Sequence, residues 1–127
     1  MTFDELYGRA RAVVHPRRLS EDADAGGVGA AVEAASGRVY TGVCIDTACS
    51  MGFCAEHAAV AAMLTAGESG RILRVVAVGS DGQVMPPCGR CREFMRQMHP
   101  DNATTEVLVA RDRVVPLIDL LPFDWHG

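Results

Sequence analysis

The stretch CAEHAAVAAMLTAGESGRILRVVAV, residues 54–78, decides the fold class. Its first part, residues 54–66, carries polar side chains at only three positions and has the composition of a helix that is buried on several sides. Gly67 is a typical residue at the end of such a helix. The following residues 72–78 form a nearly continuous apolar run, which is typical of a central strand covered on both faces. A buried helix followed by a buried strand predicts an α/β protein.

Further elements are expected on both sides of this stretch. Thr2 and Glu5 have the spacing of a capping box before a helix over residues 3–14, which His15-Pro16 ends. We expect strands at 28–35, 38–45, 72–78, 107–110 and 114–115, helices at 54–66, 88–98 and 116–121, a hairpin turn at Ser36-Gly37 and a loop at 20–29. This order predicts a three-layer α/β/α sandwich with one mixed sheet of about five strands.

Length and composition restrict the function. A chain of 127 residues with 49% hydrophobic and 22% charged residues predicts one globular domain, residues 1–127. The formal net charge of −4 argues against a nucleic-acid polymer or an anionic membrane as partner. The segment from Met1 to Glu5 has neither the basic nor the apolar part of a secretion signal, and no apolar run is long enough to span a membrane, so we expect a cytoplasmic protein.

Five cysteines are the main chemical feature of the chain. In a reducing compartment they are more often metal ligands or thiols than disulfides. Cys88 and Cys91 lie three residues apart and share a helix face, while Cys54 opens the preceding helix. Cys54 and the Cys88/Cys91 pair each follow a loop or strand and begin a helix. The N-termini of these two helices can therefore point to the same place. Three thiolates with an open fourth position predict a catalytic Zn²⁺ site, one ion per subunit.

Two charged residues complete the predicted centre. Zinc lowers the pKa of bound water toward 7, and Glu56 can carry protons from it, first to a ring nitrogen and then to a leaving amine. The three thiolates and Zn²⁺ leave a net negative charge, which two helix N-termini and the cation of Arg90 offset. We expect Arg90 to hydrogen-bond a thiolate sulfur, and Glu56 to have a raised pKa because its helix is buried.

These motifs resemble the zinc-dependent cytidine deaminase superfamily, whose pattern is Cys/His-Ala-Glu followed by Pro-Cys-x-x-Cys. The Cys-Ala-Glu form is similar to the free-nucleoside branch of cytidine and blasticidin S deaminases. The resemblance covers most of the chain, and Gly37-Arg38, His99-Pro100 and the Trp125-x-Gly127 end are most similar to blasticidin S deaminase. It implies Cys54, Cys88 and Cys91 as zinc ligands, Glu56 as the proton shuttle, and a homotetramer whose sites borrow residues from neighbouring subunits.

The expected reaction is hydrolytic conversion of a cytosine nucleoside to the uracil form with release of ammonia. Backbone groups around Ala55 and Pro87 would hold the exocyclic nitrogen. Where the family binds ribose with Asn-x-Glu, this chain has Cys44-Ile45-Asp46. Asp46 can still accept a hydroxyl hydrogen bond, but Cys44 replaces an amide poorly. The substrate therefore stays open between cytidine, deoxycytidine, a free or modified base, and a blasticidin S-type antibiotic.

The five cysteines also allow functions without catalysis. Cys49 could join the three other cysteines in a structural Cys₄ zinc module, although a buried filler is the more usual role of such a residue. A deaminase-like scaffold could also bind a ligand without turning it over. His57 is either a core histidine or a partner of a thiolate or substrate, and Trp125 either covers a pocket or simply packs.

Overall fold

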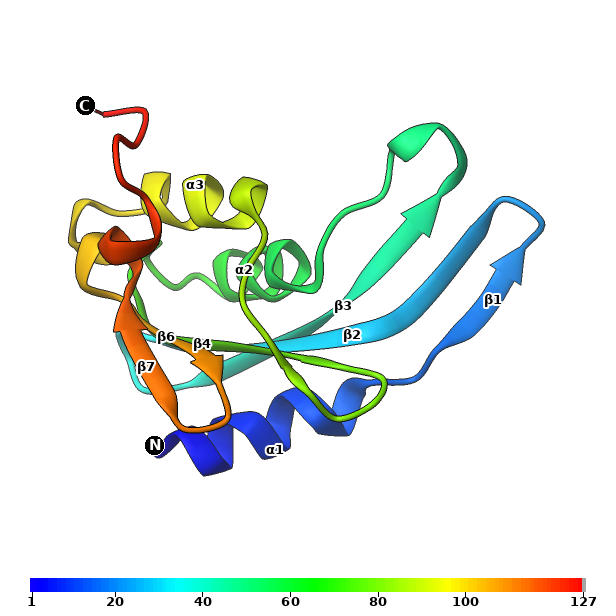
Figure 1. Ribbon diagram of the computed structural model, residues 1–127, viewed down its shortest axis with the longest axis horizontal. Helices are drawn as coiled ribbons and strands as arrows, with labels where there is room; N and C mark the ends of the chain where they lie inside the picture. The colour runs from blue at the N-terminus through cyan, green and yellow to red at the C-terminus, as the bar shows by residue number, and fades with distance from the viewer. Residues whose placement is uncertain (127) are drawn as a thin grey trace.

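The computed structural model describes residues 1–126 and forms three layers, with α1 on one face of a sheet and α2 and α3 on the other (Figure 1). Gly127, part of the resemblance at the C-terminus, lies outside the described residues. The elements are α1 (Phe3–Val13), β1 (Arg17–Ser20), β2 (Ala23–Ala34), β3 (Val39–Thr47), the 3₁₀ helix η1 (Ala48–Ser50), α2 (Ala55–Thr65), β4 (Ile72–Gly79), β5 (Val84–Met85), α3 (Gly89–Gln97), η2 (Pro100–Thr104), β6 (Glu106–Ala110), β7 (Arg113–Pro116) and η3 (Leu117–Leu120).

The sheet is mixed, as the sequence predicts. Its path runs β1-β2-β4-β6-β7, with β3 added to β2 and β5 added to β4. Strands β4 and β6 pair in parallel, and the other pairs are antiparallel. Because β2 is long, β3 follows one of its edges, while β1 and β4 share the other.

Alternating side chains of β2 and β4 divide the core between the two faces of the sheet. Ala31 and Val76 pack with Leu6 of α1, whereas Val32 and Val75 pack with α2 and α3. Successive residues of a strand point to opposite faces, so a continuous apolar run fills both cores. This confirms the prediction of a central strand covered on both sides.

The sheet has seven strands, and the expectation of about five was wrong because β1 and β5 were missed. The predicted loop at 20–29 is in fact the turn between β1 and β2 followed by the start of β2. Its residues Ala23 to Ala25 form a strand because they pair with β1 on one edge and β3 on the other. Tertiary pairing therefore overrides the weak strand propensity of Asp, Ala and Gly.

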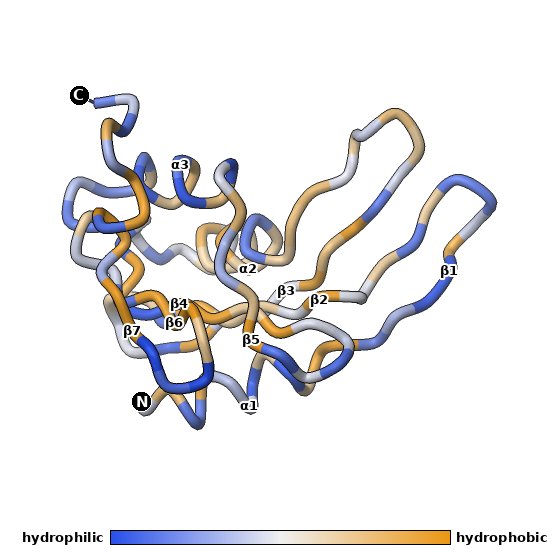
Figure 2. The backbone as a smooth tube through the Cα atoms, viewed as in Figure 1, coloured by the Kyte–Doolittle hydropathy of each residue, from blue (hydrophilic) through white to orange (hydrophobic). Residues whose placement is uncertain are grey.

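These strands form an arm that extends beyond the helices (Figure 1). We use "the arm" for residues 17–25 and 45–50, and its hairpin tip is hydrophilic (Figure 2). The predicted helices near residues 3–14, 54–66 and 88–98 are present within one residue at each end, and the expected helix at 116–121 is the 3₁₀ turn η3. Within residues 1–126, none of the helices has the length and hydropathy needed to cross a membrane.

Candidate active site

Three sulfur atoms meet where α2 and α3 begin. Cys54 is the N-cap of α2, Cys88 is the N-cap of α3, and Cys91 lies in the first turn of α3. Their sulfur atoms all lie within 4.8 Å of one another. The Sγ atoms of Cys54 and Cys88 are 3.4 Å apart, and those of Cys88 and Cys91 are 3.5 Å apart. Sulfurs at about 2.3 Å from a tetrahedral ion are about 3.8 Å apart, so this donor set has the size and chemistry of a zinc site.

The ionisation of these thiols also fits a site for a cation. Burial, the Glu56 carboxylate and the two other thiols raise the pKa of Cys91 far above its ordinary value. Burial and the Cys88 thiol raise the pKa of Cys54 as well. The pKa of Cys88 is lowered because the backbone N–H groups of Cys91 and Arg90 and the neighbouring thiols outweigh burial. A divalent cation supplies the positive charge that three adjacent thiolates need.

Close packing of α2 on β3 places Cys54 and Glu56. Gly42 of β3 lies so near the backbone of Ala58 and Ala59 that a Cβ atom there would overlap it. The Glu56 side chain follows in the first turn of α2, where it is only 4% exposed and lines the cavity described below. Burial raises its pKa above the ordinary value, in the direction that proton transfer near neutral pH requires.

His57 of α2 contacts the sulfur cluster. Its Nδ1 atom is 3.4 Å from the sulfur of Cys91, and its ring stacks on Phe94 with centroids 3.9 Å apart. Burial and the nearby Arg90 charge lower the pKa of the ring, so the neutral form is favoured at pH 7. Of the two roles expected for this residue, the contact supports that of a thiolate partner.

The guanidinium of Arg90 points elsewhere than expected. It donates to the carbonyl of Gly52 at 3.4 Å, and the side-chain nitrogen that contacts a sulfur in the described part of the chain belongs to His57. Arg90 still lines the cavity beside Cys88. The predicted hydrogen bond from Arg90 to sulfur is therefore replaced by a contact to the loop before α2, and its role in charge balance stays a prediction.

A cavity of about 580 Å³ opens on the sulfur cluster and on Glu56. The residues predicted to contact substrate, Cys44, Asp46 and Ala55, all line it. The Cys44 thiol accepts a hydrogen bond from the backbone N–H of Val28 at 3.2 Å and lies 3.9 Å from a carboxylate oxygen of Asp46. The structure thus places Cys54, Cys88, the proton-transfer residue and the predicted substrate residues around one space, while Cys91 joins the sulfur cluster from outside the lining.

Other lining residues were not predicted from the sequence. They come mainly from the end of β3, the loop that follows it, and β5 with the residue after it, and include Thr47, Ser50, Gly52, Phe53, Met85 and Pro86. Cys49 and Ser50 have positive φ angles of 61° and 56°, a backbone strain that is frequent beside functional sites. No local sequence pattern predicts that these residues line the cavity, because their positions depend on the arm and on the short strand β5.

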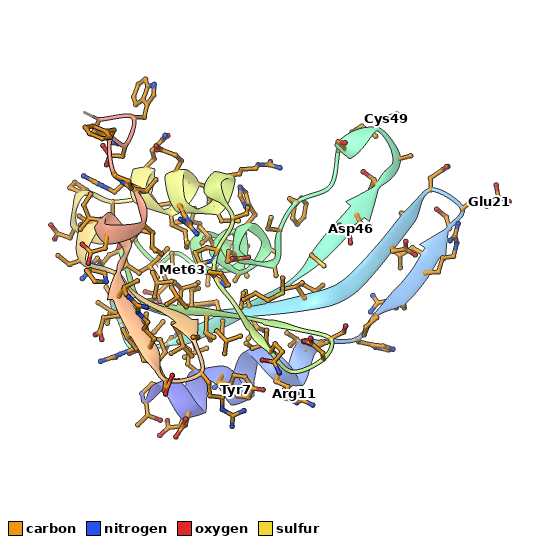
Figure 3. All side chains as sticks on the ribbon, in the orientation of Figure 1. Tyr7, Arg11, Glu21, Asp46, Cys49 and Met63 are labelled. Carbon is orange, nitrogen blue, oxygen red and sulfur yellow. The ribbon has the colours of Figure 1, made fainter. Side chains whose placement is uncertain are left out.

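Two residues singled out in the sequence lie outside the cluster. Cys49 is exposed at the tip of the arm, so its prediction as a buried filler was wrong (Figure 3). It is also not a member of the three-sulfur group found among residues 1–126, which removes the support for a Cys₄ module. The Trp125 residue is 79% exposed, and its backbone N–H donates to Glu93. Its side chain therefore does not pack in the core, and it does not line the cavity of this chain.

Comparison with known proteins places this geometry in a family. The chain is 37% identical to a cytidine deaminase of Mycobacterium tuberculosis over 97 residues, which are 75% of this chain and 69% of that protein. No known protein-family profile matches it. The crystal structure of cytidine deaminase from M. tuberculosis superposes with a TM-score of 0.82 at 30% identity, covering 98% of both chains. That from Burkholderia pseudomallei gives 0.79 at 29% identity, covering 98% of this chain and 100% of the other. The chain therefore belongs to the cytidine deaminase superfamily and is a deaminase of its zinc-dependent class.

Proposed function

We propose that the protein removes the exocyclic amine of a cytosine nucleoside (cytidine, deoxycytidine or an analogue) by hydrolysis, giving the uracil form and ammonia. The observation that carries this proposal is the buried Glu56 carboxylate in the same cavity as Cys54 and Cys88, whose sulfurs cluster with the sulfur of the buried Cys91. Zinc held by these sulfurs would supply a Lewis acid that makes hydroxide available near neutral pH. We propose zinc rather than a harder cation because all three donors are sulfur.

The residues of the chain have separate tasks in this mechanism. Glu56 takes a proton from the attacking water and delivers it to ring atom N3. It then takes the proton of the hydroxyl group now on C4 and supplies it to the departing amine as the C4–N bond breaks. Its burial beside Ala55 keeps bulk water from the proton path. The helix N-termini at Cys54 and Cys88 offset the negative charge of the sulfurs.

A modified pyrimidine nucleoside, such as one of the blasticidin S type, is the second candidate substrate. The surroundings of Cys44 support this second candidate. The Cys44 thiol is already hydrogen-bonded to Val28, and it has no amide group that could bind a ribose hydroxyl. An absorbance screen of cytidine, 2′-deoxycytidine, cytosine, 5-methylcytidine and blasticidin S would rank the substrates. Ammonia release from any of them would exclude a scaffold that only binds.

Replacing Glu56 by Gln tests the catalytic assignment. We expect turnover to fall at least about a hundredfold while bound zinc, measured by elemental analysis, stays at the wild-type level. Glu21→Gln, at the exposed tip of the arm, is the matched control for loss of one carboxylate. Undiminished turnover by Glu56→Gln would remove Glu56 from the mechanism.

We further propose that residues 1–127 form one deaminase domain and assemble as a homotetramer. The outward side of α2 supports an interface, because Ala61 and Leu64 leave apolar surface exposed. Sedimentation velocity would measure the assembly. The need for reduced thiols at Cys54, Cys88 and Cys91 supports the cytoplasm as the compartment.

A further inference from the structure

Two consecutive prolines join β5 to α3 beside the sulfur cluster. Pro86 and Cys88 line the cavity, while Pro87 between them is buried. Proline has no backbone N–H group, so neither proline can donate a hydrogen bond that would hold this segment in place. The segment can be fixed only through its carbonyl groups and by packing, and it ends at a residue that carries one of the three sulfurs.

Arg92 of α3 holds this segment by one of its carbonyl groups. The Nε atom of Arg92 donates to the carbonyl of Pro87 at 2.8 Å, and its Nη1 atom donates to the carbonyl of Leu120 at 3.2 Å. One planar guanidinium therefore joins the start of α3 to the end of η3, which lies beside it (Figure 1). A hydrogen bond from a charged donor is about twice as strong as a neutral one, and this one is received by a buried residue.

Backbone carbonyls are the partners of Arg92 in place of a carboxylate. Within residues 1–126, Arg74 and Arg96 form ion pairs, whereas Arg92 does not. Its side chain is only partly exposed, so its charge is compensated chiefly by the two carbonyl dipoles. The contact with Pro87 is thus a main bond of this side chain and not a by-product of a salt bridge.

The direction of the Pro87 carbonyl bears directly on Cys88. The peptide group between these two residues is planar, so a bond that holds the carbonyl oxygen of Pro87 also fixes the N–H of Cys88 and the start of its backbone. Cys88 is the N-cap of α3, and its side chain does not cap the helix. Its Sγ atom lies 3.4 Å from that of Cys54 and 3.5 Å from that of Cys91. A rotation of this one peptide group would move the sulfur relative to both.

From this we infer that Arg92 is a positioning residue of the active site. It holds the segment from Pro86 to Cys88, so that the Cys88 sulfur and the Pro86 side of the cavity keep their places. Arg92 lies outside the lining of the cavity, so it acts through Pro87 and Cys88 and does not touch substrate. Its effect on turnover rests on the proposed deamination, whereas its effect on the sulfur cluster does not.

Arg92→Ala tests this positioning. We expect zinc affinity, measured by competition with a chromophoric chelator, to fall at least about tenfold, as for other groups that orient metal ligands. The absorption spectrum of the Co²⁺-loaded protein should change, because it depends on the geometry of the sulfur ligands. With cytidine, or the best substrate of the screen above, kcat should fall about 10- to 100-fold while KM stays within about threefold of wild type.

Arg71→Ala is the matched control. Arg71 is also partly exposed and donates to a backbone carbonyl, that of Ile72 at 2.7 Å, but it lies outside the lining of the cavity. Its loss should lower Tm and leave zinc affinity and kcat within about twofold of wild type.

Arg92→Lys carries the test if Arg92→Ala does not fold. Lysine keeps the charge but lacks the planar fork that reaches both carbonyls, so its zinc affinity should lie between those of wild type and Arg92→Ala. Wild-type zinc affinity and an unchanged Co²⁺ spectrum in the Arg92 variants would overturn the inference even if Tm falls, because Arg92 would then only hold η3 against α3. If no substrate loses ammonia while the Arg92 variants still bind zinc more weakly, the proposed reaction fails and the positioning of the Cys88 sulfur stands.

Discussion

Cys54 and Cys88 occupy the same position in two helices, and this explains much of the site. Each is an N-cap with an extended backbone, at φ −75° and ψ 160° for Cys54 and φ −68° and ψ 168° for Cys88. Neither helix start has a side-chain cap, where Ser, Thr, Asp or Asn would ordinarily accept a backbone N–H. Both sulfurs lie beside the positive end of a helix dipole, which favours a negative charge there.

His57 should influence the metal without touching it. His57→Ala removes the Nδ1 contact to the Cys91 sulfur and the stacking on Phe94, and we expect zinc affinity to fall about 10- to 100-fold, as for other partners of metal ligands. Competition with a chromophoric chelator measures the affinity. His15→Ala, on an exposed loop residue, is the control. An unchanged affinity would show that His57 only fills space.

At the scale of elements, Asn102 joins η2, β4 and α3. Its amide nitrogen donates to the carbonyls of Gly70 at 2.9 Å and Met95 at 2.8 Å, and its oxygen accepts from the N–H of Ile72 at 2.8 Å. The residue is fully buried. These bonds set where β4 begins relative to the end of α3, the helix that carries two of the sulfurs.

Asn102→Ala leaves one buried donor and two buried acceptors without their partner, so we expect the free energy of unfolding to fall by about 2–4 kcal/mol. Urea denaturation followed by circular dichroism measures it. Thr104→Ala, on an exposed residue of the same 3₁₀ turn, should cost less than about 1 kcal/mol. Similar losses for both variants would contradict the role of Asn102 as a buried connector.

Glu68 connects the end of α2 to the hairpin between β2 and β3. Its carboxylate accepts hydrogen bonds from Ser36 at 2.5 Å and Tyr40 at 2.9 Å, which lower the pKa of Glu68 below the ordinary 4.5. An acid with a lowered pKa stabilises the fold above its unfolded pKa, and this stabilisation is lost as the pH falls through the folded pKa.

Replacing Glu68 by Gln should therefore lower Tm at pH 7, and the difference from wild type should shrink as the pH falls below about 4. Thermal melts across pH 3–7 test this, with Glu21→Gln as the exposed control. A difference that is constant with pH would assign the effect of Glu68 to shape rather than charge.

At the scale of the whole molecule, an ion held by the three sulfurs would join α2 to α3. The three sulfurs come from the starts of two helices that are separated in the chain by β4 and β5, so a bound ion cross-links parts of the fold that would separate on unfolding. We expect a chelator to lower Tm by several degrees and added zinc to restore it. Cys88→Ser, which replaces one sulfur ligand, should reduce the sensitivity of Tm to the chelator. An unchanged Tm after verified metal removal would mean that packing alone holds the helices together.

The sequence by itself determined the features that are local in the chain. The apolar run at β4 predicts burial on both faces, and the cysteines at the starts of α2 and α3 predict two helix ends that can share an ion. Helix ends are marked by short-range chemistry, such as the Thr2 side chain that accepts from the N–H of Glu5 at 3.2 Å. These features need only neighbours within one helical turn or one strand.

The tertiary structure alone decided the arm, the strand β5 and the partner of the Cys91 sulfur. Residues 23–25 become strand only because β1 and β3 pair with them. His57 rather than Arg90 reaches the sulfur because the first turns of α2 and α3 lie beside each other. The position of Asp46 opposite Asp24 depends on strand register in the same way. Contacts between residues far apart in the chain depend on packing and pairing of whole elements, which no local pattern of residues encodes.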